Sequence, residues 1–113
     1  PIYSPEDIAR IRYIREQTGA KIMCGIMPLV SYKNARFMAN EMPGIRIPDE
    51  VVERYRPDMT REEAEQVGVD LAAGLAEEMK DIADGYYFMT PFNRAGMIAK
   101  ILQKIINGQE EQA

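Results

Sequence analysis

The sequence contains no histidine and no tryptophan, and its only cysteine is Cys24. The lack of histidine removes the commonest metal ligand and the side chain that most often transfers protons near neutral pH. Metal sites and histidine-based acid-base catalysis are therefore not expected. A single cysteine excludes a disulfide within the chain and is typical of a reducing compartment, so we expect a cytoplasmic protein. With no base available to activate it, Cys24 is interpreted as a packed small side chain.

Basic residues and long apolar runs are also scarce. The 14 lysines and arginines are outnumbered by 18 acidic residues, and a net charge of -4 argues against nucleic acid as a partner. No apolar run approaches the roughly 20 residues that cross a membrane. The 113 residues, 46% of them hydrophobic, suit one globular domain. Because the chain begins at Pro1 without an initiator methionine, we expect it to be part of a longer protein.

Capping signals and apolar spacing predict the helices. Ser4 before a proline predicts the start of a helix that ends at Gly19, and Ser31 predicts the start of a second one. Further helices are expected over residues 49–55, from a capping box at residues 60–63 to about residue 82, and over residues 95–106, before a polar tail. Gly68 and Gly74 lie inside the longest of these helices and are interpreted as permitting close packing.

Three short apolar segments predict strands, at residues 21–28, 45–47 and 86–89. The first is a continuous apolar run, typical of a strand buried on both faces. Helices alternate with these strands in the order α-β-α-β-α-α-β-α, which predicts parallel strands joined by right-handed crossovers. Three strands are too few to close a barrel. The sequence therefore predicts an α/β fold that is part of a larger one.

Two polar residues follow the ends of predicted strands. Arg94 lies between the last strand and the last helix, where ligands are usually held in α/β proteins and where the positive end of a helix dipole favours anions. Its planar guanidinium suits a carboxylate or a phosphate, although a surface arginine in the first helical turn is the alternative interpretation. Asn34 offers a donor and an acceptor behind the first strand, with capping or solvation as its alternative role.

Residues 25–34 (GIMPLVSYKN), 45–48 (IRIP) and 92–95 (FNRA) resemble, in order and spacing, 5,10-methylenetetrahydrofolate reductase. The sequence of these segments is most similar to the bacterial bifunctional type, in which the reductase follows a homocysteine S-methyltransferase domain. The resemblance implies that residues 1–113 form one partial domain, the C-terminal portion of a (β/α)8 TIM barrel with about strands 6–8 and helices 5–8. It also implies a flavoprotein that uses FAD to pass a hydride from NAD(P)H to methylenetetrahydrofolate.

The same resemblance assigns three substrate-binding residues. Arg94 matches the arginine that holds the glutamate tail of the folate. Asn34 falls where many members carry a glutamine that contacts the substrate, and Met38 where some carry a phenylalanine that packs on the folate. The general acid and most FAD contacts of the family lie on earlier strands. We therefore expect no catalytic, FAD-binding or metal-binding residue in this chain, and no catalysis by the chain alone.

Expected partners are the folate substrate and either a second copy of the chain or the missing N-terminal half of the barrel, with no nucleic acid and no membrane. Two other functions remain open at the level of the sequence. The chain could be a free-standing half barrel that serves binding or assembly without catalysis, since three strands leave apolar faces uncovered. It could also belong to a different folate- or phosphate-binding barrel with similar motifs at the strand ends.

Overall fold

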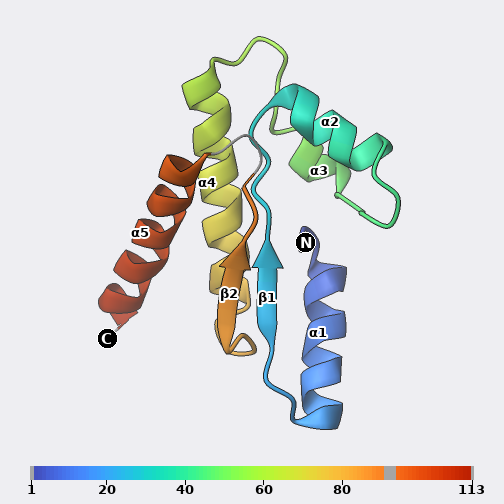
Figure 1. The fold of residues 1–113 in the computed structure, drawn as a ribbon, viewed down its shortest axis with the longest axis vertical. Helices are drawn as coiled ribbons and strands as arrows, with labels where there is room; N and C mark the ends of the chain where they lie inside the picture. The colour runs from blue at the N-terminus through green and yellow to red at the C-terminus, as the bar shows by residue number, and fades with distance from the viewer. Residues whose placement is uncertain (1, 91–93, 113) are drawn as a thin grey trace.

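The computed structural model describes residues 2–90 and 94–112, with side chains as far as residue 108. Within these residues the elements follow in the order α1 (Pro5–Thr18), β1 (Met23–Ile26), α2 (Tyr32–Asn40), α3 (Asp49–Val52), α4 (Arg61–Glu78), β2 (Gly85–Phe88) and α5 (Ala95–Gln112) (Figure 1). This mixed helix and strand architecture fits part of an α/β fold. None of the described helices combines the length and the apolar character that crossing a membrane requires.

The two strands form a parallel sheet in which β1 pairs directly with β2, in register from Met23 opposite Gly85 to Ile26 opposite Phe88. The pairing continues past the strand ends, because the Met89 N–H donates to the Ile26 carbonyl at 3.0 Å. On the other edge of β1, the Ile2 N–H donates to the Gly25 carbonyl at 3.2 Å. All of α2, α3 and α4 thus belong to one crossover between two adjacent parallel strands.

The strand predicted at residues 45–47 is absent from the described sheet, and this prediction was wrong. Because β1 and β2 bond to each other directly, no position remains between them for a third strand. Ile45 and Ile47 instead pack against a core cluster that includes Leu29 and Met38. Two isoleucines on either side of an exposed arginine suit an extended loop as well as a strand. The barrel portion in the described residues therefore has two strands and not the predicted three.

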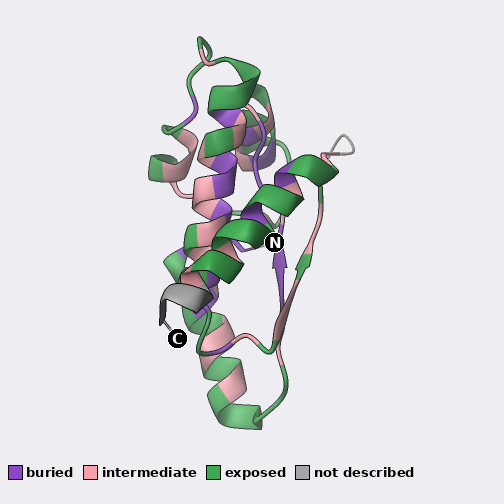
Figure 2. Cartoon of the chain, turned by 90° about the vertical axis from the view of Figure 1, so that its left-hand side faces the viewer, coloured by how far each residue is buried: buried purple, intermediate pink, exposed green. Residues whose placement is uncertain are grey.

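Helices α4 and α5 cover one face of the sheet, and Figure 2 shows the strands with these helices to one side of them. Cys24 and Ile26 of β1 are buried there with Val69 of α4 and Ile101 of α5. A second cluster lies beyond the carboxyl end of β1, around Tyr55. Both clusters fix the helices that follow the strand ends, which is where ligands are held in folds of this class.

The opposite face of the sheet is only partly covered within the described residues. Cys24, Gly25 and Ile26 are all buried, which agrees with the prediction of a strand buried on both faces, but the end of the strand at Met23 is not. Met23 is 60% exposed and Tyr87 is 50% exposed. The Tyr87 ring lies over Gly25, where an added Cβ would come within 2.6 Å of it. This arrangement leaves an apolar strand face only partly covered.

Most predicted helix starts are confirmed by their caps. The Ser4 hydroxyl accepts the Asp7 N–H, and Gly19 closes α1 with a φ of 66°. Thr60 and Glu63 form the predicted capping box at the start of α4. The last helix does not end at residue 106 as predicted but continues to Gln112. Gly108 lacks the positive φ of a helix stop, and the following glutamines and glutamates favour helix. Helix α3 ends earlier than predicted, at Val52 and not at residue 55.

The two glycines of α4 have different surroundings. An added Cβ at Gly68 would lie 2.3 Å from the Leu29 carbonyl oxygen and 2.5 Å from Cε of Met97, so the predicted close packing is confirmed there. At Gly74 no atom of the described residues lies within 4 Å of an added Cβ, and the prediction was wrong. Gly68 thus lets α4 approach the segment that follows β1, whereas Gly74 faces empty space.

Candidate functional site

The backbone of Arg94 lies immediately before helix α5, which is the next described element after β2. The Arg94 carbonyl accepts the Met97 N–H at 3.0 Å and the Ile98 N–H at 3.4 Å, which places Arg94 in front of the first helical turn. Its own N–H donates to the Thr90 hydroxyl at 3.1 Å. Figure 1 shows the start of α5 beyond the carboxyl ends of the two parallel strands. The predicted position of Arg94 at a strand-helix junction is confirmed.

The side chain of Arg94 is largely covered, with 9% of it exposed, and its Nη2 atom is buried. Its Nη2 atom lies 3.8 Å from Oε2 of Glu65 on α4, a separation longer than a hydrogen bond. Nη2 has no hydrogen-bond partner among the described residues. A buried donor without a partner is costly, and more so when it carries charge. This guanidinium can therefore donate hydrogen bonds to an oxygen anion, which would satisfy Nη2.

Glu65 is shared between two cations. Its second oxygen lies 3.7 Å from Nζ of Lys100 on α5, and its own side chain is 18% exposed. One carboxylate between Arg94 and Lys100 leaves one positive charge uncompensated at the N-terminal end of α5. The helix dipole adds to that positive potential. The electrostatics therefore favour a carboxylate group of a ligand at this position.

Sequence reasoning did not identify Glu65 or Lys100. No local signal could have identified them, because their approach depends on how α4 packs against α5. These two helices make the most extensive contact of any helix pair in the fold. Arg94 and Lys100 lie six residues apart in the sequence. That spacing does not indicate that both side chains approach the same carboxylate, Glu65 of α4.

Asn34 holds the loop that follows β1. Its Oδ1 atom accepts the Val30 N–H at 3.0 Å, and its own N–H donates to the Ser31 hydroxyl at 3.0 Å. The side-chain nitrogen of Asn34, Nδ2, has no hydrogen bond within the described part of the chain. The acceptor is thus occupied in a capping role, and only the donor remains for a ligand. Substrate contact by Asn34 stays a prediction.

Met38 belongs to the core. It is 5% exposed and packs in one cluster with Tyr3, Ala35 and Tyr55. The three predicted residues therefore have different partners. Met38 packs α2 onto the core, Asn34 binds Val30 and Arg94 pairs with Glu65. A direct contact between Met38 and a ligand stays a prediction.

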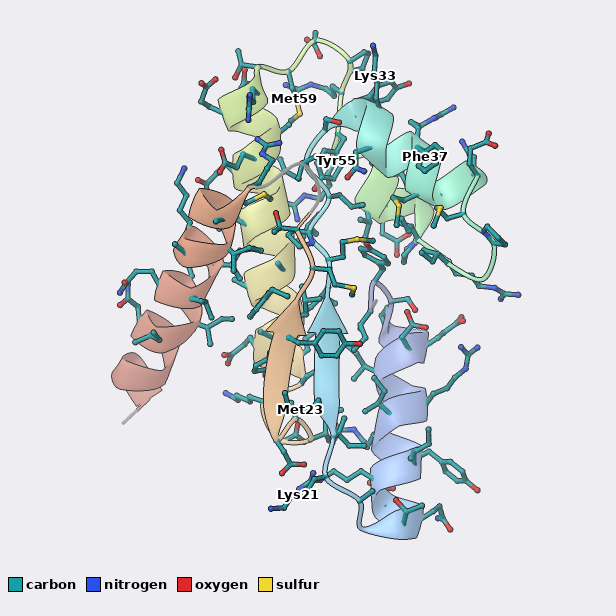
Figure 3. All side chains as sticks on the ribbon, viewed as in Figure 1. Lys21, Met23, Lys33, Phe37, Tyr55 and Met59 are labelled. Atoms are coloured by element: carbon teal, nitrogen blue, oxygen red, sulfur yellow. The ribbon has the colours of Figure 1, made fainter. Side chains whose placement is uncertain are left out.

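Two tyrosine hydroxyls fix the segment between β1 and α2. Tyr55 donates to the Leu29 carbonyl at 2.8 Å, and Tyr3 donates to the Met27 carbonyl at 2.8 Å. Figure 3 shows Tyr55 between α4 and the segment that leads into α2. Burial raises the pKa of both tyrosines, so they remain protonated donors at neutral pH. Both hydroxyls thus hold the carboxyl end of β1 in place.

The family model described as methylenetetrahydrofolate reductase matches residues 2–106. The chain belongs to the methylenetetrahydrofolate reductase family. A comparison with curated proteins found no match. Membership implies a TIM barrel and oxidoreductase activity for the intact protein, and it confirms the resemblance read from the sequence at the level of the family.

Among the described residues of this family member, the unpartnered Nη2 atom of Arg94 fits a carboxylate. Arg94 contributes their only buried side-chain nitrogen or oxygen atom without a hydrogen bond. Burial raises the pKa of the Cys24 thiol, which disfavours a reactive thiolate. Within the same residues, no group of three histidine, cysteine, aspartate or glutamate side chains could hold a metal ion.

Proposed function

We propose that this protein reduces 5,10-methylenetetrahydrofolate to 5-methyltetrahydrofolate in one-carbon and methionine metabolism, using FAD and NAD(P)H. Membership of the reductase family supports this reaction. The amino-acid sequence of residues 27–34 supports the bacterial bifunctional type. One observation carries the assignment of a role to this chain, namely the buried Nη2 atom of Arg94 before α5, which has no hydrogen-bond partner among the described residues.

In this proposal Arg94 binds the glutamate carboxylate of the folate. The guanidinium presents two parallel N–H donors, and charge-assisted hydrogen bonds of this kind are stronger than neutral ones. Glu65 keeps the guanidinium in place at 3.8 Å without closing a hydrogen bond, so the donors remain available. Asn34 can donate a side-chain amide N–H to the substrate, directly or through a water, and Met38 packs the same helix, α2, onto the core. FAD, when bound, carries the hydride, and we assign no catalytic residue to this chain.

The test measures binding of 5-methyltetrahydrofolate to the full protein and to its Arg94→Ala variant by calorimetry. Hydrogen bonds to charged groups contribute about 1.5–3 kcal/mol, so we expect about 10- to 150-fold weaker binding. The matched control ligand is 5-methyltetrahydropteroate, which lacks the glutamate. Its affinity should be the same for the unsubstituted protein and for Arg94→Ala. Arg46→Ala removes an exposed guanidinium elsewhere and serves as the control variant.

Equal affinity of the unsubstituted protein and Arg94→Ala for 5-methyltetrahydrofolate would reject the assigned role of Arg94. A comparable loss for both ligands would point to damaged folding instead of a lost carboxylate contact. An intact protein that is colourless after purification with added FAD would reject the flavoprotein assignment.

The partly covered face of the sheet favours a second candidate function, an assembly module without catalysis of its own. Met23 and Tyr87 are half-exposed or more on that face, and uncovered apolar surface is typical of an interface. Sedimentation velocity on the chain distinguishes the candidates. A well-folded monomer at all concentrations would contradict the assembly module.

A further inference from the structure

Glu65 of α4 lies between two cations, one just before α5 and one on it, and forms a hydrogen bond with neither. Its Oε2 atom is 3.8 Å from Nη2 of Arg94, and its Oε1 atom is 3.7 Å from Nζ of Lys100. A charge-assisted hydrogen bond of this kind normally measures about 2.7–2.9 Å. Among the described residues no other donor contacts this carboxylate. Each oxygen of Glu65 thus approaches a different cation, and the carboxylate is drawn in two directions.

A second ion pair between the same two helices has a closed geometry. Lys104, which follows Lys100 by one helical turn on α5, donates a hydrogen bond to the carboxylate of Asp70 on α4. Within the described residues Asp70 forms an ion pair with this one cation, whereas Glu65 lies near two. The spacing of α4 and α5 therefore allows a closed ion pair, and the two carboxylates differ in the number of cations that they face.

We infer that Lys100 is a positioning residue for the carboxylate site at Arg94, because it draws Glu65 away from the guanidinium and keeps Nη2 free for a ligand. The inference rests on the proposed folate-binding role of Arg94. Without Lys100, the charge of Glu65 is directed at Arg94 alone, and a short contact would satisfy the unpartnered Nη2 atom. A ligand carboxylate would then have to displace Glu65 before it could bind.

The exposure of the three side chains separates the positioning role from ligand binding. The side chain of Lys100 is 62% exposed, whereas those of Glu65 and Arg94 are 18% and 9% exposed. Water and salt screen an exposed ammonium group, so a direct pair between Lys100 and a ligand would add little affinity. Glu65 is largely covered, and charges there are screened less. We therefore expect a modest effect of Lys100 on ligand binding, transmitted through Glu65.

The test measures binding of 5-methyltetrahydrofolate to variants of the full protein by calorimetry. Lys100→Met removes the charge and keeps an unbranched side chain, and we expect about two- to tenfold weaker binding. Lys100→Arg keeps the charge and should restore the affinity of the unsubstituted protein. Lys104→Met is the matched control, because it removes a lysine of the same helix whose partner is Asp70 and not Glu65. It should leave the affinity unchanged.

The double variant Glu65→Gln/Lys100→Met distinguishes an effect through Glu65 from direct contact with the ligand. Once position 65 carries a neutral amide, removal of the Lys100 charge should change the affinity by less than about twofold. A loss of the same size with and without the Glu65 carboxylate would show that Lys100 acts on the ligand directly, and it would overturn the inference. Unchanged affinity in Lys100→Met would overturn it as well.

Arg94→Ala separates a failure of this inference from a failure of the proposed function. If Arg94→Ala binds 5-methyltetrahydrofolate as tightly as the unsubstituted protein, the proposed role of Arg94 is rejected, and the inference about Lys100 is rejected with it. If Arg94→Ala loses affinity and Lys100→Met does not, only the inference about Lys100 is rejected. Loss of affinity in both, with rescue by Lys100→Arg, supports both.

Discussion

Replacing Gly68 by alanine should destabilise the protein, although alanine is the better helix former. The new Cβ would lie 2.3 Å from the Leu29 carbonyl oxygen, more than 1 Å closer than the ordinary contact of 3.4 Å. That carbonyl cannot yield freely, because the buried Tyr55 hydroxyl holds it at 2.8 Å. Overpacking costs about 1–3 kcal/mol, and a disturbed hydrogen bond adds about 1 kcal/mol. Alanine offsets about 1 kcal/mol through its helix propensity, which leaves a net loss of about 1–3 kcal/mol.

Gly74→Ala in the same helix is the matched comparison. Its Cβ meets nothing within 4 Å in the described structure, so only the helix propensity changes and we expect a gain of about 0.5–1 kcal/mol. Urea unfolding followed by far-UV circular dichroism measures both variants against the unsubstituted protein. If Gly68→Ala proved as stable as Gly74→Ala, the close approach of α4 to the segment after β1 would be refuted.

Two further predictions concern single side chains. Tyr55→Phe leaves the buried Leu29 carbonyl without its hydrogen-bond donor. Urea unfolding should therefore show a free energy of unfolding about 1–2 kcal/mol lower, and an unchanged urea midpoint would contradict the hydrogen bond. The Ile22 N–H and then the Arg15 guanidinium hold the pKa of Asp84 below its ordinary value of 3.8. The stabilisation from this carboxylate is therefore present above about pH 4 and lost as the pH falls below it. Asp84→Asn should be less stable at pH 7, with the difference shrinking toward pH 2 in acid unfolding; a difference independent of pH would contradict this.

Local signals in the sequence predicted the helix starts well. Ser4 and Thr60 satisfy N–H groups within their own first helical turns, so the information lies within a few residues. Helix ends were harder to predict, since the glycine at residue 108 suits a helix stop but is also tolerated inside a helix. Only its φ distinguishes the two cases, and the surrounding chain decides it.

The wrong strand at residues 45–47 has a long-range cause. Whether an extended isoleucine segment joins a sheet depends on whether a strand edge is free, and here the β1 edge in question is taken by β2. The sequence contains no local sign of that pairing. The same reason explains why the junction at Arg94 could be predicted but its partner Glu65 could not, because one is set by neighbouring residues and the other by packing between helices.

The packing of Gly68 and the geometry at Arg94 are physically linked. Glu65 lies three residues before Gly68 on α4, close to the same face of the helix. Gly68 contacts both the Leu29 carbonyl and Met97, which lies in the first turn of α5, three residues after Arg94. A side chain at position 68 would push α4 away from both segments and lengthen the 3.8 Å separation of Glu65 and Arg94. The glycine that costs helix stability therefore also sets where the buried guanidinium is held.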